Sequence, residues 1–215
     1  YELYLYSNRI EQIEPNAFRG LGKLSKLILD GNRLKNLSGV FDGLASLRTL
    51  SVLRNRVEAV QRRTFGGSML RLLDTLYLAD NRIAWIEPDA FMELVALRYL
   101  YLSGNRLRRL PSMAALGQLL YLDVSNNRLD GAALQNDTFR GVSALRTLLL
   151  SFNSIERVQE EASGVFSSSL PMLNKLDLQG NRIATLPFGL FAGLASLRDL
   201  LLGMNRLERL ANGTF

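Results

Sequence analysis

The chain has 215 residues, of which 47% are hydrophobic and 21% are charged, and its formal net charge at pH 7 is +6. No stretch reaches the roughly 18 to 20 apolar residues that a membrane helix needs, so we expect membrane association only through segments outside this chain. The absence of cysteine and histidine excludes thiol nucleophiles, the serine–histidine relay and most metal sites. We therefore expect neither an enzyme nor a cofactor.

One phrase of about eleven residues recurs along the chain. At 97–107 it reads LRYLYLSGNRL, with leucines at places one, four, six and eleven and an asparagine at place nine. A shortened copy, LYLYSNRI, stands at 3–10, and the other copies begin at residues 24, 47, 73, 119, 145, 173 and 197. The asparagines at place nine are Asn8, Asn32, Asn55, Asn81, Asn105, Asn127, Asn153, Asn181 and Asn205. Nine asparagines in one leucine frame indicate a structural repeat.

Each copy predicts a short strand, because places three to seven alternate with a period of two. In chain order these strands fall at 2–6, 26–30, 49–53, 75–79, 99–103, 121–125, 147–151, 175–179 and 199–203. The long connections between copies favour a parallel sheet with right-handed coiling, which is a solenoid. We expect the asparagines to satisfy backbone groups where the chain turns inward and to stack as a ladder.

The connecting segments carry a second pattern. In IEPNAFRGLGKL, IEPDAFMELVAL and LPFGLFAGLASL a phenylalanine stands ten residues after the asparagine. The predicted phenylalanine column, on the outer side of the core, contains Phe18, Phe41, Phe65, Phe91, Phe139, Phe166, Phe191 and Phe215. Only the repeat of 22 residues lacks this residue, and it offers Met113 instead. Insertions at 66–70 and 160–171 are expected to bulge on the convex side.

The full pattern LxxLxLxxNxLxxLxxxxFxxL resembles the "typical" class of leucine-rich repeats over the whole chain. The resemblance implies a curved right-handed horseshoe, with a parallel β-sheet on its concave face and short helical or irregular segments on its convex face. It also implies an extracellular or cell-surface recognition scaffold, similar to Toll-like receptor ectodomains, Slit-like guidance proteins and the variable lymphocyte receptors. We predict one domain over 1–215 with nine repeats, the first and last incomplete. The cysteine-rich caps of the family are absent, so we expect an internal section of a longer protein.

Tyrosines mark the best candidate for a binding surface. Six of the seven occupy strand places three, five or seven, which point away from the leucine core. Adjacent strands lie about 4.8 Å apart, so the middle repeats should gather several tyrosines in one patch. The candidate ligand-binding residues are Tyr77, Tyr99, Tyr101, Tyr121, Asp123 and Tyr4. Tyrosine is enriched at recognition surfaces, although aromatic residues also suit strands for local reasons.

Arginine follows the asparagine in eight of the nine copies, and Ser154 is the exception. This arginine row consists of Arg9, Arg33, Arg56, Arg82, Arg106, Arg128, Arg182 and Arg206. Such a row could bind an anionic glycan, but a long polar residue also covers the edge of a sheet with its aliphatic stem. We expect a protein ligand or co-receptor on the concave face, and no nucleic acid. The alternative is a matrix assembly component or an anionic-glycan binder, with the oligomeric state left open.

Three sequons mark candidate glycosylation sites in a secreted protein: Asn36, Asn136 and Asn212. Their number is close to chance for this composition. No catalytic arrangement is evident, because Asp123 and Asp177 share place five but are two strands apart. The sequence therefore predicts a non-enzymatic receptor, adhesion or innate-recognition section.

Overall fold

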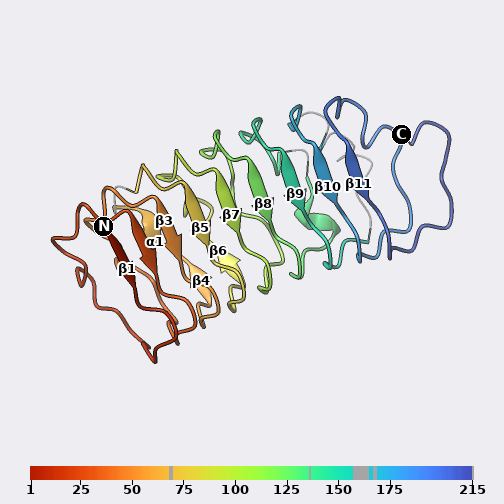
Figure 1. Ribbon diagram of the computed structural model, residues 1–215. Helices are drawn as coiled ribbons and strands as arrows, with labels where there is room; N and C mark the ends of the chain where they lie inside the picture. Colours follow the sequence, from red (N-terminus) through yellow and green to blue (C-terminus); the bar gives the residue numbers. More distant parts are fainter. Residues whose placement is uncertain (68–69, 136, 157–164, 167–168, 215) are drawn as a thin grey trace.

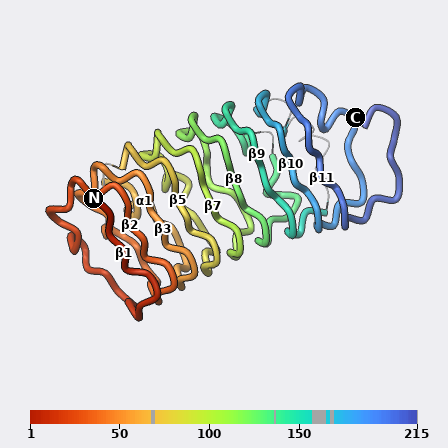
Figure 2. Tube along the Cα trace, viewed as in Figure 1, coloured from red at the N-terminus to blue at the C-terminus, as the bar shows by residue number. Residues whose placement is uncertain are grey.

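The fold, seen in a computed structural model, is a solenoid with one parallel sheet of nine strands (Figures 1 and 2). The structure describes residues 1–67, 70–135, 137–156, 165–166 and 169–214. The strands, in their order across the sheet, are β1 (Glu2–Tyr4), β2 (Lys26–Ile28), β3 (Thr49–Ser51), β5 (Thr75–Tyr77), β7 (Tyr99–Tyr101), β8 (Tyr121–Asp123), β9 (Thr147–Leu149), β10 (Lys175–Asp177) and β11 (Asp199–Leu201). All nine predicted strands are present, but each covers only places three to five.

The return segments contain little regular structure. The short strands β4 (Ala59–Val60) and β6 (Trp85–Ile86) pair in parallel, and α1 (Arg62–Phe65) and the 3-10 turn η1 (Gly131–Ala133) are single turns. No helix in the described part of the chain has the length and apolar character to cross a membrane. The insertion at 160–171 lies largely outside the described residues, as do two residues of the insertion at 66–70. The irregular convex side predicted from the repeat is confirmed.

The core lies between the sheet and the return segments. The leucines at place four are fully buried from β2 to β10, because alternation directs them away from the solvent-exposed sheet face. Behind them runs the phenylalanine column, in which Phe41, Phe65 and Phe91 stack with ring centroids 6.0 Å apart. Met113 is buried in the repeat without a phenylalanine. The predicted column is therefore confirmed for the described residues, and Phe215 lies outside them.

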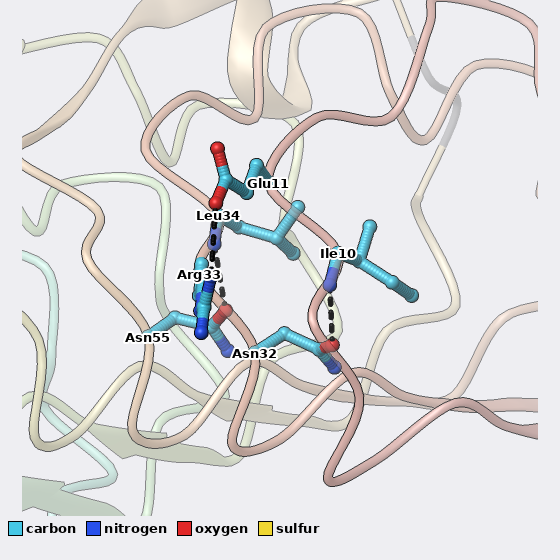
Figure 3. Close-up of polar contacts among 6 residues, drawn as sticks. All are labelled: Ile10, Glu11, Asn32, Arg33, Leu34 and Asn55. Atoms are coloured by element: carbon cyan, nitrogen blue, oxygen red, sulfur yellow. Dashed lines mark hydrogen bonds and ion pairs between the residues drawn. The ribbon is translucent and has the colours of Figure 1, made fainter.

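The asparagine ladder connects every pair of neighbouring repeats, and Figure 3 shows two of its bonds, from Ile10 to Asn32 and from Leu34 to Asn55. Asn55 accepts a hydrogen bond at Oδ1 from the backbone N–H of Leu34 at 3.0 Å, and its Nδ2 donates to the carbonyl of Leu29 at 3.0 Å. The same two bonds recur from Asn32 to Asn205. Each carboxamide also donates to a carbonyl of its own repeat, as Asn105 does to Leu102. The ladder predicted from the sequence is confirmed.

The turn before each asparagine adopts a left-handed conformation, which sequence reasoning did not identify. Place eight has φ between +51° and +67° in all nine repeats. Only three of these residues are glycines, namely Gly31, Gly104 and Gly180. The other six accept a left-handed conformation that costs a non-glycine residue about 1 to 2 kcal/mol. The ladder and the core must therefore hold these turns in place.

Removing a ladder side chain should destabilise the solenoid far more than removing an exposed tyrosine. In Asn105→Ala the N–H of Ile83 and the carbonyls of Leu78 and Leu102 lose their buried partner, so we expect a loss of about 2 kcal/mol or more. Tyr101→Ala should cost about 1 kcal/mol, the size of an aromatic contact. Urea unfolding followed by circular dichroism measures both values, and the opposite order would contradict this account of the ladder.

Replacing a glycine at place eight should destabilise the protein more than replacing a glycine with ordinary backbone geometry. Gly104 has φ +66°, and an added Cβ would lie 2.3 Å from Oδ1 of Asp80. Gly104→Ala should therefore lower the free energy of unfolding by about 1 to 2 kcal/mol. Gly117 has ordinary backbone geometry, with no atom closer than 3.8 Å to an added Cβ, so Gly117→Ala is the matched control. Equal losses in the two variants would show that the left-handed turn is not the cause.

Candidate functional site

The sheet register brings four of the predicted tyrosines together on the concave face. Tyr77 on β5 lies opposite Tyr101 on β7, and Tyr99 on β7 lies opposite Tyr121 on β8. Asp123 continues the column that contains Tyr101. All five side chains are half-buried. The positions paired across the strands are neighbours in space although 22 to 24 residues separate them in sequence.

Three of the rings form one stack. The rings of Tyr77 and Tyr101 are nearly parallel, with centroids 4.5 Å apart and an interplanar angle of 16°. Tyr121 leans diagonally onto Tyr101, with centroids 5.0 Å apart, although its partner in the register is Tyr99. Tyr99 is instead covered by Arg98, whose guanidinium carbon lies 5.7 Å from the ring centroid. We call Tyr77, Tyr101 and Tyr121 the tyrosine stack, and Tyr99 flanks it.

The tyrosine stack is uncharged, and the neighbouring Asp123 is fixed by hydrogen bonds. Asp123 accepts hydrogen bonds from the backbone N–H of Ser125 at 2.9 Å and from its hydroxyl at 2.6 Å. Burial, with smaller contributions from Asp123 and Tyr101, raises the pKa of Tyr121 to about 12. Burial also raises the pKa of Tyr101. A phenol with the usual pKa of about 10 is already protonated at neutral pH, and these shifts extend protonation to higher pH, so both hydroxyls can donate as well as accept hydrogen bonds.

Tyr4 is not part of this cluster. It lies on β1, three strands away from Tyr77 on β5. Its hydroxyl donates to the carboxylate of Glu2, and Nζ of Lys26 lies 5.3 Å from its ring centroid. The hydrogen bond with Tyr4 raises the pKa of Lys26. The structure therefore places Tyr4 at the edge of the sheet, apart from the other predicted residues.

A hollow beside the tyrosine stack was not predicted from the sequence. It has a volume of about 620 Å³ and is lined by ten residues from β1, β2, β3 and β5 and their flanks, which include Ser51, Thr49, Lys26, Arg48 and Tyr77. The hollow exists because the place-five column changes from Tyr77 to the small Ser51 on the next strand. A run of small residues beside a bulky column is the signal that could have revealed it.

The remaining candidates lie elsewhere. Asn36 and Asn212 are exposed, which glycosylation requires, and Asn136 lies outside the described residues. The carboxylate of Asp177 forms a local hydrogen bond, in which its Oδ1 accepts from the backbone N–H of Gln179 at 2.9 Å. Within the described ranges no group of three or more carboxylates could hold a metal ion.

The raised pKa of Tyr121 should make stability fall at high pH. The pKa of Tyr121 in the folded state, about 12, lies above the usual tyrosine value of 10.0, so the folded state retains a proton that the unfolded state releases. This contribution is fully present below pH 10 and is lost as the pH rises towards 12. Tyr121→Phe should show a smaller decrease in unfolding free energy between these pH values. Identical pH profiles of the variant and the unmodified protein would contradict the assignment.

Comparisons with known proteins place this repeat architecture in a family. The model of the leucine rich repeat family matches residues 1–57, 47–107, 71–129 and 171–215. Mouse podocan is 31% identical over 95% of the chain, rat lumican is 33% identical over 96%, and Toll-like receptor 3 of Boselaphus tragocamelus is 31% identical over 98%. The chain spans 36%, 58% and 27% of these relatives' lengths, respectively. They are extracellular or cell-surface proteins, which confirms the expected localisation.

Solved structures agree with the sequence matches. TLR13 in complex with ssRNA13 superposes with a TM-score of 0.81 at 30% identity, covering 95% of this chain and 29% of that one. A leucine-rich repeat protein of Leptospira interrogans superposes with a TM-score of 0.79 at 25% identity, covering 97% of this chain and 50% of that one. The family match, the relatives and the asparagine ladder agree, and the chain belongs to the leucine-rich repeat family.

Proposed function

We propose that this chain is a non-enzymatic recognition section of an extracellular or cell-surface protein, and that it binds a protein ligand or co-receptor on its concave face. We further propose that residues 1–215 act as one continuous repeat domain within a longer protein. The observation that carries the proposal is the tyrosine stack, flanked by Tyr99. The sheet fold does not require aromatic rings there, since other repeats carry serine, threonine, lysine or aspartate at the same places.

The stack has the physical properties of a protein-binding anchor. A standard interface buries about 800 Å² on each partner, and a few central aromatic side chains supply most of its energy. The stacked rings of Tyr77 and Tyr101 are already ordered, so binding them costs little side-chain entropy. The neighbouring hollow offers space for a partner side chain against Tyr77. Its rim carries both basic and acidic residues, namely Lys26, Arg48, Glu2 and Asp30, which suits a mixed protein surface.

The relatives support an interaction scaffold without specifying the partner. They include receptors and matrix proteoglycans, and the TLR13 structure is a complex with single-stranded RNA. The expectation that no nucleic acid binds therefore lacks support from the comparisons. We favour a protein partner because the stacked rings lie on a face whose hollow mixes acidic with basic residues, whereas a nucleic acid backbone requires a predominantly basic surface.

Replacing two residues of the tyrosine stack should strongly weaken binding of the protein partner. We expect Tyr101→Ala with Tyr121→Ala to reduce binding to a partner purified from the native source by about 2 kcal/mol or more, as for hot-spot residues. Tyr6→Ala is the matched control, because Tyr6 is an exposed tyrosine outside the stack. Charge changes at Arg182 or Arg206 should matter less. Surface plasmon resonance measures the affinities after circular dichroism has shown that each variant is folded.

Two results would overturn this proposal. One is unchanged affinity in the double tyrosine variant together with loss of affinity in the arginine variants. The other is single-stranded RNA that binds more tightly than any protein partner and depends on the same tyrosines.

A further inference from the structure

The arginine row is not uniform, because some of its members are neutralised by the preceding repeat. Arg33 forms an ion pair with Glu11 at 3.2 Å (Figure 3), and Arg182 forms one with Glu156 at 3.4 Å. In both pairs the arginine at place ten contacts the residue at place twelve of the repeat before it. Among the described residues, only these two members of the arginine row form such an ion pair.

In the middle of the row the partner position has no acid. The residue at place twelve before Arg106 is Ala84, and the one before Arg128 is Arg108. Arg109 follows Arg108 directly, and all four arginines are exposed. Within the described part of the chain none of the four forms an ion pair. Residues Arg106, Arg108, Arg109 and Arg128 therefore form a basic cluster that the fold itself leaves uncompensated.

The surroundings of this basic cluster favour a ligand that has polar groups and also a flat ring surface. A hollow of about 290 Å³ lies next to it, lined by nine residues that include Arg109, Pro111, Ser112, Gln135 and Thr138. Trp85, which is 52% exposed, occupies the same place in its repeat as Arg109 does in the next one. An exposed indole gives a sugar ring an apolar surface to pack against.

The acidic residues nearby do not neutralise the cluster. Asp130 is engaged at η1, where Oδ1 accepts from the N–H of Ala132 at 2.9 Å. Asp137 lines the same hollow as Arg109. Four arginines thus stand against two carboxylates, one of which caps a turn, so the local charge stays positive.

We propose that the basic cluster binds a sulfated glycan, with its sulfate groups on Arg106, Arg108, Arg109 and Arg128 and an uncharged sugar portion in the adjoining hollow. Guanidinium groups form paired hydrogen bonds with tetrahedral oxyanions, and a bound sulfate would relieve the repulsion between neighbouring arginines. Such glycans are available to an extracellular protein, and the relatives place this chain there. The basic cluster lies after the asparagine turn, whereas the tyrosine stack lies on strand places three to five. Glycan binding at the basic cluster therefore does not depend on the proposed protein partner.

The test compares two pairs of arginines from the same row. The variant Arg106→Gln with Arg128→Gln removes two uncompensated charges, and Arg33→Gln with Arg182→Gln removes two that are ion-paired. The net charge changes equally, so non-specific attraction is matched. We expect heparin affinity, measured by isothermal titration calorimetry at physiological salt, to fall about tenfold in the first variant and less than about twofold in the second. The slope of log affinity against log salt should decrease by about two in the first variant.

Further outcomes decide the ligand class and the location. Desulfated heparin should lose most of the affinity, and Tyr101→Ala should retain heparin binding. Arg108→Gln with Arg109→Gln should reproduce the loss. Equal losses in both matched variants, no loss in either, or a tighter complex with single-stranded RNA than with heparin would each overturn the proposal. A loss of heparin binding in Tyr101→Ala would overturn the assigned location, whereas failure of the tyrosine experiment with a protein partner would leave this site unaffected.

Discussion

Buried asparagine carboxamides hold neighbouring repeats in a fixed register, and the rest of the molecule depends on that register. From Asn32 to Asn205 each side chain bonds to the backbone of its own repeat and of the one before it, as Asn55 does with Val52, Leu29 and Leu34. An unsatisfied buried amide would cost about 1 to 3 kcal/mol, so a slip between repeats is opposed at every step. The ladder also holds the left-handed residue that precedes each asparagine, including the non-glycine residues Arg54 and Phe152.

The fixed register converts a position within the repeat into a position on a surface column. Residues at place five of successive repeats lie one strand apart, which is why the rings of Tyr77 and Tyr101 stack with centroids 4.5 Å apart. Residues at places ten and twelve meet between repeats in the same way, as in the ion pair between Arg33 and Glu11. Because the core needs only leucine, asparagine and phenylalanine at their places, the remaining places are free to carry binding chemistry.

Two such surfaces differ in their chemistry and their place on the solenoid. The concave face offers neutral, stacked phenols, and burial keeps the pKa of Tyr121 at about 12. The basic cluster around Arg106 and Arg128 offers exposed positive charge beside a small hollow. Hydrophobic and aromatic contact is not screened by salt, whereas the attraction between arginine and an anion is. A protein ligand and an anionic glycan could therefore occupy the two surfaces independently.

The sequence by itself determined the repeat, the strands, the asparagine ladder, the phenylalanine column and the adjacency of Tyr77 to Tyr101. These features follow from periodic burial and a parallel register, which the recurring spacing of leucine, asparagine and phenylalanine reveals. Only the tertiary structure decided that Tyr121 leans onto Tyr101 rather than onto Tyr99, and that a hollow opens over Ser51. The physical reason is that a repeat pattern fixes which Cα atoms are neighbours, whereas the direction of a side chain depends on the volumes and charges around it in space.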